Sequence, residues 1–298
     1  MGLLIALTAA PFLLGVINRT KAVFAGRKGR PLLQAYYDIA KLLRKGAVYS
    51  RSTTWVFRSG PIVGLAAVLA AFFLVPFGGT SALLAFPADL VLFAYLLGLA
   101  RFFTVLAALD TASSFEGMGA SREVTFSALA EPALLLALAV VARETGEISL
   151  SGMFGGLSFA SWGAAPAPLT LACAAIFVVL LAENARIPVD DPETHLELTM
   201  VHEVMVLDHS GPDLAYIQYG AALKFWVLGS LLVGILLPIH AVNPWAGLAV
   251  SLAGLAALAL AVGIVESFMA RLRLLVVPRL LLGAAACSLV ALLLAVWS

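Results

Sequence analysis

The chain has 298 residues, of which 62% are hydrophobic and only 12% are charged, and its formal net charge is +1 at pH 7. Soluble globular domains carry about 25% charged residues, so this composition excludes an ordinary soluble domain, and the charge gives no indication of nucleic-acid binding. Apolar stretches long enough to cross a bilayer recur along the chain, which predicts an all-α, polytopic membrane protein.

About eight transmembrane helices are expected, in a single transmembrane domain over residues 1–298. Their approximate ranges are 2–18, 61–77, 89–109, 126–142, 168–185, 214–237, 246–266 and 275–297. The first is interpreted as a retained helix rather than a signal peptide, because its positive charges, Arg19 and Lys21, follow the apolar stretch. The connection between the fourth and fifth ranges is rich in Gly, Ser, Ala and Pro, which predicts a surface loop without chemistry.

The first long loop, residues 19–60, holds ten of the 18 Lys and Arg residues and is therefore predicted to be cytoplasmic, which places both termini outside. Apolar residues between Leu32 and Leu43 recur at helical spacing, so an amphipathic helix is expected in the membrane interface. This helix either binds lipid headgroups or docks a soluble partner. The candidate partner-docking residues are Arg27, Lys28, Arg30, Lys41, Arg44 and Lys45.

An acid-rich cytoplasmic segment, residues 183–213, follows the fifth span. Asp191 is suited to cap a helix that begins at Pro192 and runs to His209. On such a helix Asp190, Glu193, Glu197 and Asp208 would share one sector, and His195, His202 and His209 another. Successive histidines would lie about 10 Å apart, too far for one metal ion, so no metal site is expected.

Ionisable side chains near hydrocarbon are costly, at roughly 2.5–3.5 kcal/mol each at a helix centre, so they mark functional sites. Burial and neighbouring charges shift carboxyl pKa values in opposite directions, which suits proton exchange near neutral pH. The alternative is a solvated helix without chemistry. The candidate proton-relay residues are Glu183, Asp190, Glu193, Glu197, Glu116, Glu123, Glu131, His195, His202, Glu203, Asp208, Lys224 and Glu266, with Arg186 and Arg122 tuning their pKa.

Two basic residues inside the spans have a second interpretation. Arg101 is interpreted as a counter-charge, and Lys224 either joins the relay or extends to the membrane surface. The two cysteines, Cys173 and Cys287, lie in apolar stretches and form no ligand motif, whereas an iron–sulfur cluster typically takes four thiolates. The sequence therefore predicts no cofactor in this chain, and any electrons would travel in another subunit.

The stretch from Ala182 to Glu193 reads Ala-Glu-Asn-Ala-Arg-Ile-Pro-Val-Asp-Asp-Pro-Glu and resembles the signature of the complex I membrane subunit that frames the quinone entrance. Gly29–Gln34 and Gly119–Pro132 are similar to other motifs of that family, in matching order. Residues 190–203 and 210–213 are more similar to the branch found in formate hydrogenlyase (subunit 4) and in the membrane anchors of group 4 [NiFe] hydrogenases. The complex I branch has a glutamate near Ala221, where this sequence is apolar.

The resemblance implies a membrane anchor and coupling subunit in a prokaryotic inner membrane, which links electron transfer to proton or sodium translocation. It implies as partners hydrogenase-like large and small subunits, a ferredoxin-like iron–sulfur subunit and antiporter-like membrane subunits. Iron–sulfur clusters, with or without a NiFe centre, would lie in those partners. The alternatives are a quinone-site subunit of a complex I-type NADH:quinone oxidoreductase, an independent ion or solute transporter, and an anchor without a proton role.

Overall fold

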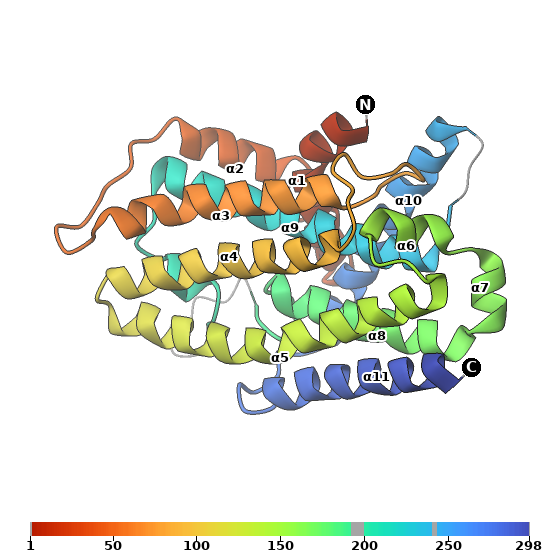
Figure 1. Cartoon of the computed structure of the whole chain (residues 1–298). Helices are drawn as coiled ribbons and strands as arrows, with labels where there is room; N and C mark the ends of the chain where they lie inside the picture. The colour runs from red at the N-terminus through yellow and green to blue at the C-terminus, as the bar shows by residue number, and fades with distance from the viewer. Residues whose placement is uncertain (1, 192–199, 240–242, 298) are drawn as a thin grey trace.

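The computed structural model describes residues 2–191, 200–239 and 243–297, and the described residues form a helical bundle (Figure 1). The helices are α1 (Gly2–Phe24), α2 (Gln34–Leu43), α3 (Trp55–Leu74), α4 (Asp89–Asp110), α5 (Ser114–Thr145), α6 (Leu150–Gly156), α7 (Phe159–Ala164), α8 (Pro166–Glu183), the 3-10 helix η1 (Glu203–Val206), α9 (Gly211–Leu236), α10 (Pro244–Phe268) and α11 (Val277–Trp297).

Within the described residues, seven helices are long and apolar enough to cross a membrane: α3, α4, α5, α8, α9, α10 and α11. The helix α1 corresponds to the first expected span. The prediction of an all-α polytopic membrane protein is confirmed. Three boundaries were wrong by six residues or more. Residues 19–24 and 55–60 were expected in the first loop but belong to α1 and α3, and residues 114–125 were expected in a loop but belong to α5. With 32 residues at 1.5 Å each, α5 is about 48 Å long and exceeds the roughly 30 Å hydrocarbon core.

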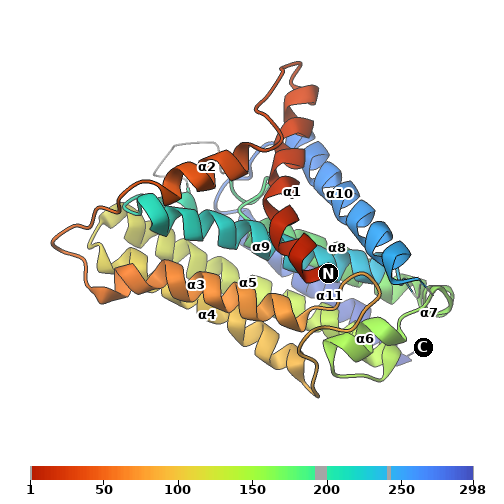
Figure 2. The same cartoon turned by 90° about the horizontal axis from the view of Figure 1, so that it is seen from above.

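The helices pack mainly as neighbouring pairs, with α3 against α4, α5 against α8 and α11, and α1 against α10. Viewed from above, α9 runs beside α2 and α3 and passes α1 and α8 (Figure 2). It carries Phe225 and Trp226, which are almost completely buried. These contacts bring α4, α5, α8 and α9 close enough for their charged side chains to meet.

The predicted amphipathic helix forms as α2 and is attached to α1 beside a proline. Because Pro11 has no N–H, the carbonyl of Leu7 has no partner within α1. The hydroxyl of Tyr219 on α9 donates to this carbonyl at 2.9 Å, and Tyr36 on α2 donates to the next carbonyl, that of Thr8. The break in the α1 ladder thus holds α2 and α9 in place.

Three loops meet at one end of the bundle. The backbone N–H of Val48 donates to Ser210 Oγ at 3.0 Å, and the N–H of Thr54 donates to Asp110 Oδ2 at 2.6 Å. The first loop, the α4–α5 connection and the segment before α9 therefore lie at the same end of the bundle.

At the other end of α4, the connection between α5 and α8 contains the short helices α6 and α7, where a plain surface loop was expected. Asp89, at the start of α4, is fully buried and accepts the N–H of Leu150 at 2.6 Å. It also accepts a hydrogen bond from the Ser149 hydroxyl, with Oγ 3.0 Å from Oδ2. A buried carboxylate that satisfies the first turn of α6 explains why this segment folds onto the bundle.

Candidate proton-relay site

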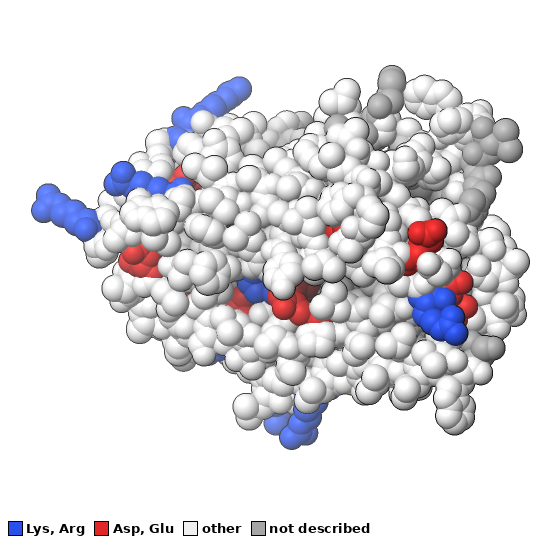
Figure 3. All heavy atoms as spheres, in the orientation of Figure 1, with Lys and Arg blue, Asp and Glu red and all other residues white. Residues whose placement is uncertain are grey.

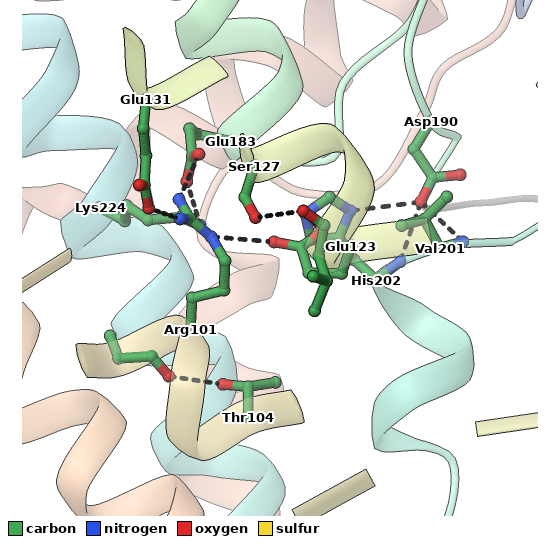
Figure 4. Close-up of polar contacts among 12 residues, drawn as sticks. Arg101, Thr104, Glu123, Ser127, Glu131, Glu183, Asp190, Val201, His202 and Lys224 are labelled. Carbon is green, nitrogen blue, oxygen red and sulfur yellow. Dashed lines mark hydrogen bonds and ion pairs between the residues drawn. The ribbon is translucent and has the colours of Figure 1, made fainter. Parts of the chain in front are cut away.

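Arg101, near the middle of α4, contacts carboxylates from two other helices (Figure 4). Its Nη2 lies 2.5 Å from Glu183 Oε1 at the end of α8, and its Nε lies 3.3 Å from Glu123 Oε1 on α5. Its Nη1 is paired with Glu131, about two helical turns further along α5. Lys224 on α9 lies 3.4 Å from Glu183 Oε2. This arrangement distributes two cations among three carboxylates, as buried charges require.

His202 connects this cluster to the loop after α8. Its Nε2 lies 3.1 Å from Glu123 Oε2, and its Nδ1 lies 3.4 Å from Asp190 Oδ2. An imidazole accepts a proton on one ring nitrogen while it releases one from the other. The contacts therefore form a continuous line of charged groups from Glu131 through Arg101, Glu123 and His202 to Asp190. Arg101 keeps its proton and links Glu123 to Glu131 by charge.

Asp190 also organises the backbone of its loop. Its Oδ2 accepts the N–H groups of Val201 and His202 at 3.2 and 3.1 Å, and its Oδ1 lies 2.9 Å from Arg271 Nη2. The prediction of a continuous helix to His209 is wrong for residues 200–209, which form turns and η1. The physical reason is that Asp190, rather than helical carbonyls, binds the N–H groups of residues 201 and 202.

The expected sharing of helix faces fails for the same reason. His202 faces Glu123 and Asp190, whereas His209 stacks on Phe57 with ring centroids 3.9 Å apart. Asp208 is exposed, in contrast to the buried Asp190. Glu193, His195 and Glu197 lie outside the described residues.

The two titratable groups of the loop hold each other in their charged forms. Burial alone raises the pKa of Asp190, but the hydrogen bond and charge of His202, with the charge of Arg271, outweigh burial and lower this pKa. Burial alone lowers the pKa of His202, but the charges of Glu123 and Asp190 outweigh burial and raise its pKa above the ordinary 6.5. The pKa of His202 is thus raised above its ordinary value, and its charged form is favoured.

A second charged group lies where α1, α10 and the end of α8 meet. The Glu266 side chain is fully buried, 3.2 Å from Lys21 Nζ and 3.5 Å from Arg186 Nη1. Arg186, which was expected to tune the pKa of the candidate acids, therefore contacts one of them, Glu266. Removing a buried carboxylate from two cations is costly, so this group ties three segments together.

Several other predicted residues lie apart from Arg101. Glu116 is buried and its Oε1 accepts the N–H of Asp208 at 3.1 Å, so it holds the end of the loop. Arg122 donates to the carbonyl of Met200 at 2.8 Å. Glu203 lies in η1 beside the cavity described below. The six candidate docking residues, Arg27, Lys28, Arg30, Lys41, Arg44 and Lys45, are all exposed.

Two arginines make more contacts in the site than the sequence had indicated. Arg101 was interpreted as a counter-charge, and it pairs with three glutamates. Arg271, which contacts Asp190, was not among the predicted site residues. An arginine inside an apolar span requires acidic neighbours, so the position of Arg101 in the sequence could have predicted this cluster of acids. Lys224, whose alternative was to extend to the surface, pairs with Glu183.

A cavity of about 430 Å³ adjoins the cluster. Its lining includes charged side chains, among them Arg101, Glu183 and His202, and apolar residues of α1, α3 and α4, such as Leu14 and Leu65. Within the described parts of the chain, no group of three or more His, Cys, Asp or Glu residues is arranged to hold a metal ion. The cavity has the size and mixed polarity of a small-molecule site.

Glu131 brings the charged line to the outer surface of the bundle. Its side chain is 49% exposed, whereas those of Glu123 and Glu183 are each 7% exposed. Figure 3 shows charged atoms within the otherwise uncharged middle of the face formed by α4 and α5. A half-exposed carboxylate in a membrane-spanning helix is expensive in lipid, which indicates that this face meets protein or water.

Comparison with known proteins places the chain in a family. The family described as NADH dehydrogenase matches residues 1–296. The chain belongs to this family. The predicted relationship to complex I membrane subunits is therefore confirmed.

Two relatives and one solved structure illustrate where the chain stands in the NADH dehydrogenase family. It is 32% identical to formate hydrogenlyase subunit 4 of Escherichia coli (strain K12), over 93% of this chain and 91% of that protein. It is 35% identical to hydrogenase-4 component C of the same organism, over 78% of this chain and 73% of that protein. The predicted similarity to the formate hydrogenlyase branch is confirmed.

The fold is also that of a chain in the membrane-bound sulfane sulfur reductase, an archaeal respiratory membrane complex. The TM-score is 0.83 at 22% identity, with 98% of this chain and 96% of that chain covered. At this identity the likeness supports the fold alone.

Proposed function

We propose that this chain is the membrane anchor and coupling subunit of a multisubunit redox complex of the formate hydrogenlyase and complex I type. It docks a soluble electron-transfer module at the end of the bundle where the three loops meet, which we call the loop end. It converts electron transfer there into proton movement within the membrane. The observation that carries the proposal is the unbroken line of contacts from Asp190 through His202, Glu123 and Arg101 to Glu131.

The two ends of this line suit its role. Asp190 and His202 lie in the loop at the docking end, where a change of charge in a neighbouring subunit alters the proton affinity of the imidazole. Glu131 lies at the exposed α4–α5 face, where an antiporter-like membrane subunit would cover the carboxylate. Glu123 and Glu131 share the Arg101 guanidinium, so a proton gained or lost by Glu123 changes the pairing of Arg101 with Glu131 and with it the proton affinity of Glu131. Electrons and iron–sulfur clusters, with or without a NiFe centre, stay in the soluble partners.

The exposed basic residues of the first loop supply a surface for those partners. Arg27, Arg30, Lys41 and Arg44 lie on α2 or on either side of it, in the loop whose later part meets Ser210 and Asp110 at one end of the bundle. Positive loops favour the cytoplasmic side, so this end faces the cytoplasm and the hydrogenase-like large and small subunits with their ferredoxin-like companion. Mass spectrometry of the complex purified through this chain tests this part, and a chain that purifies without iron–sulfur subunits contradicts it.

The relay is tested by proton translocation in liposomes containing the purified complex. The change Glu123→Gln removes a proton-carrying group that contacts both Arg101 and His202. We expect the ratio of protons moved to electrons transferred to fall at least severalfold, while the soluble module keeps its electron transfer. The matched control is Glu147→Gln, which changes an exposed acid outside this line. An unchanged ratio in an assembled Glu123→Gln complex contradicts the relay.

The cavity favours one second candidate, a quinone-reducing site. Its lining combines charged and apolar side chains, which suits a ligand with a polar ring and an apolar tail. Ala221, the place where the complex I branch carries a glutamate, lines this cavity, which weakens the candidate. Inhibition of the complex by quinone analogues, relieved by Gly64→Leu at the apolar lining, would favour this candidate over the non-quinone hydrogenase type.

A further inference from the structure

The linker between α10 and α11, residues 269–276, makes contacts that the proposed relay does not use. The N–H of Leu272 donates to the carbonyl of Pro188 at 2.9 Å, and Arg271 Nη2 lies 2.9 Å from Asp190 Oδ1. Just before the linker, Glu266 at the end of α10 contacts Arg186. Three consecutive attachments thus hold residues 186–190 against a segment that is more than 75 residues later in the chain.

Asp190 divides its two oxygens between the linker and the relay. Oδ1 faces Arg271 and accepts the N–H of Asp191 at 2.9 Å, whereas Oδ2 accepts the N–H groups of Val201 and His202 and lies next to the imidazole. A carboxylate with one oxygen held by a guanidinium has little freedom to rotate, because charge-assisted hydrogen bonds are short and directional. Arg271 is the one side-chain cation in contact with Oδ1 among the described residues, and it supports the orientation, also held by backbone N–H groups, that presents Oδ2 to His202.

We infer that Arg271 is a positioning residue of the relay, which holds Asp190 so that the imidazole of His202 stays between Asp190 and Glu123. The inference rests on the proposed function and extends it to the α10–α11 linker. The linker then transmits any movement of α10 or α11 to His202, so a membrane partner packed on these helices would influence the proton affinity of the loop.

The other charged groups around His202 come from separate elements and do not depend on the linker. Glu123 faces the imidazole from α5, and the charges of Glu183 on α8 and Lys224 on α9 also act on it. If the Asp190 carboxylate turns away, these groups stay close to the imidazole of His202, and Asp190 is the one acid that no longer contacts it. Asp190 raises the proton affinity of His202, so its loss makes the imidazole release its proton at lower pH.

The first experiment measures hydrogen–deuterium exchange in the complex purified with this chain, because exchange does not require proton pumping. In Arg271→Gln the amides of residues 201 and 202 should exchange roughly tenfold faster or more, because their acceptor is released. Arg271→Lys keeps the charge without the planar fork and should restore part of the protection. The matched control is Arg273→Gln, an exposed arginine of the same linker, which should exchange like the wild type. Unchanged exchange in Arg271→Gln overturns the inference.

The second experiment compares the pH profiles of coupled proton translocation. Arg271→Gln and Asp190→Asn should each move the profile to lower pH by about one unit, and the double variant should move it no further. Additive shifts, or a shift to higher pH in Arg271→Gln, overturn the inference. If neither variant moves the profile while exchange rises in Arg271→Gln, the relay is refuted and the positioning of Asp190 by Arg271 still stands.

Discussion

Replacing Arg101 by methionine removes the guanidinium on which three glutamates converge, while keeping a long side chain in its place. The side chains of Glu123 and Glu183 are each 7% exposed, so their charges lose a partner without gaining water. Breaking a buried ion pair in this way costs about 3–5 kcal/mol. Glu131 is 49% exposed and adds about 1 kcal/mol or less. We expect the free energy of unfolding to fall by about 3–5 kcal/mol.

Thermal unfolding in detergent measures this loss, followed by a thiol-reactive dye that reports exposure of the buried Cys173. At roughly 2–4 °C per kcal/mol, the melting temperature should fall by about 6–20 °C. The control Arg143→Met changes an exposed residue at the end of α5 and should shift it by about 2 °C or less.

A second substitution separates lost charge pairing from lost packing. Arg101→Met with Glu183→Gln neutralises one of the orphaned carboxylates, so it should recover part of the lost stability. The reasoning is refuted if Arg101→Met melts with the wild type, or if the double variant is no more stable than the single one.

Three further predictions follow from the loop and its packing. The raised pKa of His202 means that its charged form stabilises the fold. The difference in free energy of unfolding between the wild type and His202→Asn should therefore be fully present below about pH 6.5 and shrink as the pH rises further. A difference that widens as the pH rises contradicts this. Burial lowers the pKa of His209 to about 4, so the free energy of unfolding of the wild type should fall by up to about 3 kcal/mol as the pH falls from 6.5 to 4. His209→Phe should reduce this acid sensitivity in melting curves. Equal sensitivity in both proteins speaks against a buried neutral imidazole. A Cβ at Gly119 would overlap Val204 Cγ1 and lie 3.0 Å from Val201 O, whereas a Cβ at Gly117 would meet open space. Gly119→Ala should therefore lower the melting temperature, and Gly117→Ala should raise it or leave it unchanged. Two variants that melt alike would show that η1 does not pack closely on α5.

Most transmembrane helices were predictable from apolar length alone, because a membrane requires continuous apolar helix. The expected range 89–109 and the observed α4 (Asp89–Asp110) differ by one residue. The first part of α5 was missed because residues 114–125 contain Gly117, Gly119 and charged side chains, which weaken the apolar pattern. Packing of Gly119 against η1 overrides this local composition, and such packing is not visible in a sequence.

The candidate site was predictable in kind more than in geometry. An acid cluster beside an apolar span marks Glu183 and Asp190 without any structure. The contact between His202 and Glu123 depends on how α5 lies against the loop, and the contact of Arg271 with Asp190 depends on the path of the α10–α11 linker. Helical periodicity describes one segment at a time, so it could not predict pairings between separate segments.

The central claim is that carboxylates of this chain change protonation when electrons pass through a neighbouring subunit. Infrared difference spectroscopy of the complex, recorded as its iron–sulfur module is reduced, measures protonated-carboxyl bands directly. We expect a band that appears on reduction in the wild type and in Glu147→Gln, and that is lost or shifted in Glu123→Gln. A spectrum without carboxyl bands, or one that Glu123→Gln leaves unchanged, would contradict the account.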